Sequence, residues 1–178
     1  MAFLLAIAMG ACISGVEALK RGDEYLLLRG DCAIFSFGDF LAKNERPLSR
    51  RDPVTIQSLP SNRKLCPVAT LRQYLQRTSH VTSGPLFINT RTNAPLKIRS
   101  LTKLLVDFIG ELHPGSVPKS HDCRKVSSSL AFLGGMGFHE ISSFTGWSGH
   151  RVFVKHYLSQ IRSARTRCVA LGRPVGGR

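Results

Sequence analysis

Four side chains in the second half of the chain could together handle a phosphate group: His121, Arg124, Trp147 and Tyr157. His121 and Arg124 are three positions apart at the start of a predicted helix, so they share one of its faces. A helix N-terminus offers free N–H groups and a partial positive charge, which favour an anion. The guanidinium group of an arginine can bind two phosphate oxygens, and an imidazole can move a proton near neutral pH. This pair therefore predicts a phosphate-binding site.

The remaining members of the set could supply a nucleophile and further donors. The Tyr157 hydroxyl can attack phosphorus if neighbouring cations stabilise the charge that develops. Trp147 has one indole N–H donor, and Lys43 follows a hydrophobic stretch at a predicted hairpin tip. Each residue alone has an ordinary explanation, such as core packing or a solvated charge, and Lys43 is the weakest candidate because lysine is common at turns. The ordered set favours a site for phosphoryl transfer.

The charge balance indicates a polyanionic partner. The 178 residues include 25 Lys and Arg against 11 Asp and Glu, which gives a formal net charge of +14 and an isoelectric point near 10.4. Lys and Arg that contact phosphates release condensed counterions, so DNA or RNA is the expected partner. A small basic ribosomal or histone-like protein would fit the composition equally well. A basic stretch that includes Arg46, Arg50 and Arg51 could be a solvated face, but a DNA-backbone surface is the favoured interpretation.

Cysteines and histidines show no spacing typical of a metal site. The five cysteines are scattered without a CxxC pair, and their odd number argues against a disulfide framework, so we expect no metal and a reducing compartment. The apolar start, residues 3–12, looks like a signal peptide but has no preceding Lys or Arg and is short. It is also too short to span a bilayer, so we expect no secretion and no membrane partner.

Hydrophobic periodicity and turn residues predict one mainly helical α+β domain over residues 1–164, with a small antiparallel sheet near the N-terminus and a basic, flexible tail over 165–178. Arg29-Gly30-Asp31 predicts a hairpin turn. Ser100 and Ser120 are expected N-caps, and Gly134-Gly135 an expected stop. The predicted helices cover 2–19, a segment starting at Pro67, 100–112, 120–133, a short segment through Ile141 and Phe144, and 152–162; the predicted strands are 25–28, 32–35, 54–56 and the extended piece 85–88.

The order of these motifs resembles the tyrosine recombinase (phage integrase) family. Ser120-His-Asp-Cys-Arg124-Lys, Gly146-Trp-Ser and Phe153-Val-Lys-His-Tyr157-Leu are similar to its second conserved box and the residues that follow. Leu4-Leu-Ala-Ile-Ala with Ile13-Ser14 is similar to its first box. Leu65-Cys-Pro67-Val with Leu71 and Tyr74-Leu75 resembles the version in DIRS-type retrotransposons. The resemblance covers most of residues 3–160.

The resemblance implies a role for each site residue. His121 and Arg124 would bind the scissile phosphate, and Lys43 would protonate the departing 5′ oxygen. Trp147 would donate to a phosphate oxygen, and Tyr157 would form a 3′-phosphotyrosyl bond, without a metal or nucleotide cofactor. Further DNA contacts are expected from Arg46, Arg50, Arg51, Lys125, Arg151 and Lys155.

Two departures from the family pattern stand out. Tyr157 follows Trp147 by ten positions, where many bacterial members have nine, and His156 occupies the ninth. The first-box arginine, which pairs with the position of Arg124, aligns with Cys12, and the acidic residue three positions later aligns with Gly15. Lys20 and Arg21 lie too far along the predicted helix to substitute. Loss of one charged transition-state donor typically lowers the rate by ~10²–10³.

The expected function is DNA breaking and rejoining for a mobile element, with lowered activity because of Cys12. Double-stranded DNA is the expected partner, self-association into a tetramer on DNA is implied by the family, and the location would be nuclear if the source is eukaryotic. The chain lacks the family's N-terminal core-binding domain, so we expect a truncated copy. The alternatives are a catalytically dead DNA-binding remnant and an unrelated basic RNA-binding protein.

Overall fold

The computed structural model describes residues 1–38, 52–115 and 117–145 of the chain. It divides into two compact units, Met1–Arg124 and a second unit that begins at Lys125. Each unit is described by itself. No helix within the described ranges is long and apolar enough to cross a membrane.

The N-terminal segment forms two helices where the sequence predicted a single one over 2–19. Helix α1 spans Ala2–Ala8 and helix α2 spans Ile13–Glu17. Gly10 between them has a φ of 55°, in the left-handed region that ends a helix and that glycine adopts at little cost. Cys12 is extended, with ψ at 164°, and is the N-cap residue of α2. The prediction of one helix was wrong because a single glycine interrupts an otherwise continuous apolar pattern.

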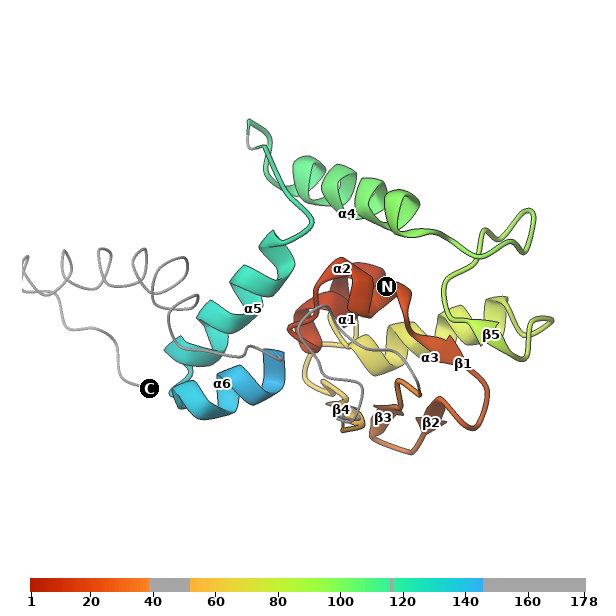
Figure 1. Ribbon diagram of the computed structural model, residues 1–178, viewed down its shortest axis with the longest axis horizontal. Helices are drawn as coiled ribbons and strands as arrows, with labels where there is room; N and C mark the ends of the chain where they lie inside the picture. The colour runs from red at the N-terminus through yellow and green to blue at the C-terminus, as the bar shows by residue number, and fades with distance from the viewer. Residues whose placement is uncertain (39–51, 116, 146–178) are drawn as a thin grey trace, which may run out of the picture. The chain divides into compact units, whose positions relative to one another are not determined.

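A three-stranded antiparallel sheet confirms the predicted hairpin and third strand. Strands β2 (Leu26–Leu28), β3 (Cys32–Phe35) and β4 (Val54–Gln57) lie side by side in that order (Figure 1). The register pairs Leu28 with Ala33, which places the turn at residues 29–31 as predicted. The segment between β3 and β4 that contains Lys43 lies outside the described residues, apart from its two ends.

A second, two-stranded sheet was not predicted. Strand β1 (Lys20–Arg21) pairs with β5 (Gly84–Pro85), more than sixty positions later in the chain. Strands this short carry no periodicity of their own, so their pairing follows from packing elsewhere. The pairing places Arg21 in the interior beside the end of helix α3 (Pro67–Arg77), which begins at Pro67 as predicted.

Helix α4 spans Ile98–Leu112 and starts two residues before the predicted cap, Ser100. The backbone N–H of Ile98 donates to the Glu17 Oε1 at 2.8 Å. A carboxylate at the end of α2 therefore supplies the acceptor that the first turn of α4 needs, and Ser100 lies within the helix. The helix ends before Pro114-Gly115, as expected.

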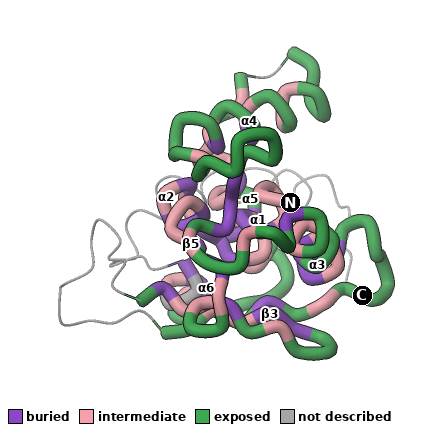
Figure 2. The backbone as a smooth tube through the Cα atoms, turned by 90° about the vertical axis from the view of Figure 1, so that its right-hand side faces the viewer, coloured by how far each residue is buried: buried purple, intermediate pink, exposed green. Residues whose placement is uncertain are grey.

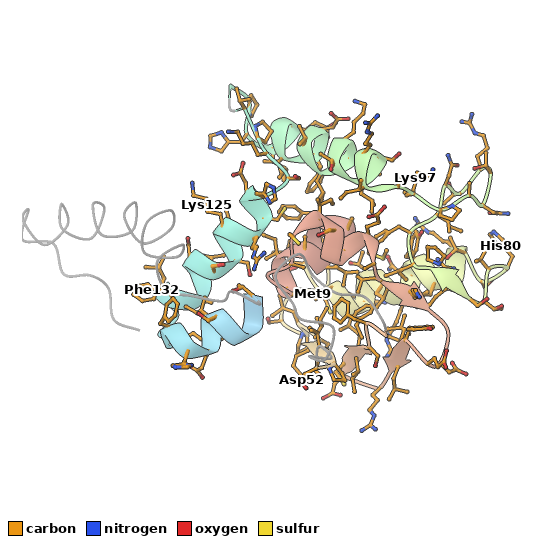
Figure 3. The ribbon with its side chains drawn as sticks, viewed as in Figure 1. Met9, Asp52, His80, Lys97, Lys125 and Phe132 are labelled. Atoms are coloured by element: carbon orange, nitrogen blue, oxygen red, sulfur yellow. The ribbon has the colours of Figure 1, made fainter. Side chains whose placement is uncertain are left out.

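The core of the first unit is formed mainly by helices α1 to α4 and by the three-stranded sheet. Its fully buried side chains include Leu5, Met9, Val16, Leu19, Phe35, Leu71, Leu86 and Leu101. Figure 2 shows buried residues, coloured purple, alternating with exposed green ones along the backbone. Met9 lies among the side chains in the middle of this unit (Figure 3). The burial of α4 is partial, because Leu101 and Leu105 are buried whereas Leu104, Phe108 and Leu112 on its predicted apolar face are exposed.

Helices α5 (Asp122–Leu133) and α6 (Phe138–Thr145) confirm two further predictions. Gly134 and Gly135 end α5, and Gly135 has a φ of 92°. The side-chain acceptor at the start of α5 is Asp122, where Ser120 was expected. In the second unit, Ile141 is fully buried against Ala131, Phe132 and Phe138.

Candidate phosphate-binding site

Arg124 lies in the first turn of α5, where the first unit ends. The preceding residue, Cys123, is 1% exposed and belongs to the hydrophobic core that α1 and α2 help to form. Burial first, and the Asp122 charge second, raise the pKa of the Cys123 thiol to about 11, so Cys123 is a neutral packing residue at pH 7. Its side chain fixes the rotation of the first turn of α5. Arg124 is therefore held half-buried at the rim of this core.

Cys12 lies close enough to Arg124 for the guanidinium charge to act on its thiol. The Cys12 Sγ also forms a hydrogen bond of 2.9 Å with the Ser14 Oγ. The fold therefore brings together two residues 112 positions apart that the family resemblance had paired, one from the first conserved box and one from the second.

The electrostatics of Cys12 reflect this setting. Burial raises the pKa of its thiol, but hydrogen bonds from Ser14 and from the Gly15 N–H, together with the Arg124 charge, lower it by more. The net pKa lies below the ordinary thiol value. The Arg124 charge thus contributes a positive potential at the Cys12 thiol, of the sign that would attract a phosphate.

Alkylation rates should report that potential directly. We expect Cys12 to react with iodoacetamide at lower pH than Cys123, whose pKa is raised to about 11. Replacing Arg124 with glutamine removes a nearby positive charge and should raise the pKa of Cys12, so its alkylation profile should move to higher pH. Mass spectrometry of each cysteine peptide across a pH series measures both. An unchanged Cys12 profile in the Arg124→Gln variant would show that Arg124 does not act on the thiol.

Two charged residues that follow Cys12 in the chain, Glu17 and Arg21, have structural partners that the sequence did not reveal. Arg21 is 3% exposed and donates to the carbonyl oxygens of Thr78, Val81 and Leu86 at 2.6–3.0 Å. Glu17 caps α4. Both side chains are thus held by other parts of the first unit. No local signal marks either contact, because both partners are remote in sequence.

The other predicted site residues divide into two groups. His121 is exposed in the turn before α5, and Lys125, the next residue after Arg124, lies on α5 (Figure 3). The remaining predicted residues lie outside the described part of the chain: Lys43, Arg46, Arg50, Arg51, Trp147, Arg151, Lys155 and Tyr157. Within the described residues, no group of three His, Cys, Asp or Glu side chains is arranged to hold a metal ion.

Solved structures resemble the chain over almost its whole length. The XerA recombinase matches 93% of this chain and 56% of its own, with a TM-score of 0.63 and 14% identity. The XerH site-specific recombinase, in a post-cleavage complex with a palindromic difH substrate, matches 93% of this chain and 44% of its own, with a TM-score of 0.60 and 14% identity. The pre-cleavage complex of XerH with a difH substrate matches 91% of this chain and 44% of its own, with a TM-score of 0.58 and 15% identity.

The chain has the fold of a tyrosine recombinase. This confirms the predicted α+β class, mainly helical with small antiparallel sheets. The chain spans about half the length of these recombinases. No protein-family model and no curated protein matches the sequence.

Proposed function

We propose that this chain is the catalytic domain of a tyrosine recombinase that breaks and rejoins double-stranded DNA. The observation that supports the proposal is the electrostatic effect of Arg124 on the Cys12 thiol, within a fold shared with site-specific recombinases. In the resemblance, Cys12 belongs to the first conserved box and Arg124 to the second. A net charge of +14 supports a nucleic acid as the partner.

The proposed reaction needs no external energy source. Arg124 and His121 bind the scissile phosphate, and Trp147 donates to one of its oxygens. The Tyr157 oxygen attacks phosphorus and forms a 3′-phosphotyrosyl bond while the bond to the 5′ oxygen breaks, and Lys43 gives that oxygen a proton. The reverse attack by a 5′ hydroxyl rejoins the strand and releases Tyr157. The phosphoester count stays constant, so no nucleotide is consumed.

Covalent capture tests this proposal. A nicked suicide duplex, from which the short fragment bearing the new 5′ hydroxyl diffuses away after cleavage, should leave DNA attached to the protein through Tyr157. We expect a slowly migrating adduct in a denaturing gel for the natural chain and none for Tyr157→Phe, which keeps the ring and removes the nucleophile. Replacing His156 with phenylalanine is the matched control, since His156 occupies the alternative spacing. An adduct that survives Tyr157→Phe would reject Tyr157 as the nucleophile.

One observation favours a second candidate function, a DNA-binding remnant without cleavage. Cys12 stands where the family's second phosphate-binding arginine is expected, and a thiol is a poor hydrogen-bond donor. This candidate predicts salt-dependent DNA binding that is unchanged by Tyr157→Phe, with no adduct on any substrate. The same two assays therefore separate the two candidates.

Three finer assignments complete the proposal. Leu65-Cys-Pro67-Val and Tyr74-Leu75 support a DIRS-type retrotransposon lineage. That lineage implies a eukaryotic source and action in the nucleus. The family's chemistry implies several copies assembled on two duplexes. Arg46, Arg50, Arg51, Lys125, Arg151 and Lys155 are the proposed DNA contacts.

A further inference from the structure

The turn that leads into α5 is closed by two hydrogen bonds between the same two residues. The backbone N–H of Lys119 donates to the Asp122 Oδ2 at 2.8 Å, and the backbone N–H of Asp122 donates to the Lys119 carbonyl oxygen at 2.9 Å. A side chain that reaches back to satisfy a free N–H ahead of a helix fixes the path of the chain into that helix. Ser120 and His121 lie inside this closed turn.

The same segment is also fixed from its other side. Cys123 is 1% exposed in the core of the first unit, so the first turn of α5 cannot rotate without moving a buried side chain. His121 precedes the anchored residue by two positions and Arg124 follows it by one. Both proposed phosphate ligands therefore project from a short backbone segment that is closed at Asp122 and anchored at Cys123.

We propose that Asp122 is a positioning residue for the phosphate site, which it serves by closing the Lys119–Asp122 turn that carries His121 and sets the start of α5. This inference rests on the proposed function. Asp122 itself does not contact phosphate, because a carboxylate would repel it. Its acceptor oxygen is the property that matters, and its negative charge additionally suits the N-terminus of a helix.

A double-mutant cycle on DNA binding tests the role. Affinity for a short duplex is measured across a salt series for Asp122→Ala, Arg124→Ala and the double variant, with circular dichroism to verify folding. We expect Arg124→Ala to weaken binding and to reduce the slope of log K against log salt by about 0.9, the value for one lost phosphate contact. Asp122→Ala should reproduce most of that loss, and Arg124→Ala should add little in its presence.

Two further variants separate positioning from simple charge or folding effects. Asp122→Asn keeps an acceptor oxygen and should bind DNA as the natural chain does, with the same salt slope. Asp107→Ala removes a more exposed carboxylate, one that pairs with Lys103 at 2.8 Å on α4, and should not weaken DNA binding. A purely electrostatic effect would instead make every loss of an acid strengthen binding to DNA.

The results of these experiments distinguish the proposed phosphate site from the positioning role of Asp122. No loss of binding in Arg124→Ala alone would overturn the proposed phosphate site, and the positioning role with it. A loss in Arg124→Ala that adds in full to that of Asp122→Ala would overturn only the positioning role. Asp122→Asn behaving like Asp122→Ala would overturn it too, because the acceptor would then be irrelevant.

Discussion

Replacing Arg21 with methionine is expected to lower the free energy of unfolding by about 3–5 kcal/mol, because several acceptors in the interior lose their donor at about 1–3 kcal/mol each. The guanidinium is 3% exposed, and its two terminal nitrogens donate to three carbonyl oxygens and to the Thr78 hydroxyl. Methionine has a similar length but no donor. The carbonyl oxygens of Val81 and Leu86 would lose their Arg21 donor inside the protein, and each buried acceptor left without a partner costs about 1–3 kcal/mol.

Chemical denaturation measures this loss, with Arg77→Met as the matched control. Arg77 is an exposed arginine in the last turn of α3, so its replacement should change stability by roughly 0.5 kcal/mol or less. None of the acidic residues that the structure describes forms an ion pair with Arg21, so its hydrogen bonds to the backbone carry the effect. A loss below about 1 kcal/mol for Arg21→Met would mean that the segment around 78–86 rearranges to satisfy its own carbonyls.

Replacing Cys12 with arginine is expected to raise the rate of covalent adduct formation by ~10²–10³, the usual effect of one charged transition-state donor. Cys12 is half-buried and within electrostatic reach of Arg124, so an arginine there would direct a second guanidinium group toward the same phosphate. Two guanidinium groups repel one another until a phosphate lies between them. The variant should therefore be less stable without DNA and gain more stability than the natural chain when DNA is added.

Suicide-substrate kinetics with Cys12→Arg measure this gain, and Cys12→Met provides a control that fills similar space without a charge. The gain should vanish when Arg124 is also replaced by alanine, because the two cations act on one phosphate. An equal gain from Cys12→Met would attribute the effect to packing. The absence of any gain, in a protein that still binds DNA, would show that Cys12 does not occupy the arginine position.

Local sequence patterns were sufficient for most of the secondary structure. Short apolar runs and a turn signal at Arg29-Gly30-Asp31 predicted β2 and β3, Pro67 marked the start of α3, and Gly134-Gly135 marked the end of α5. These features depend on φ and ψ preferences and on periodicities within a few residues of one another. The order of His121, Arg124, Trp147 and Tyr157 also predicted the tyrosine recombinase fold, which solved structures share with this chain at only 14–15% identity.

The sequence by itself thus determined the element types, the α+β class and the candidate residues of the site. The tertiary structure decided which residues, far apart in the sequence, interact with one another. Cys12 lies within electrostatic reach of Arg124, Glu17 caps α4, and Arg21 enters the core through the pairing of β1 with β5. Each of these contacts joins residues at least 57 positions apart. Their free energy comes from burial and from satisfying remote polar groups, which leaves no trace in local periodicity.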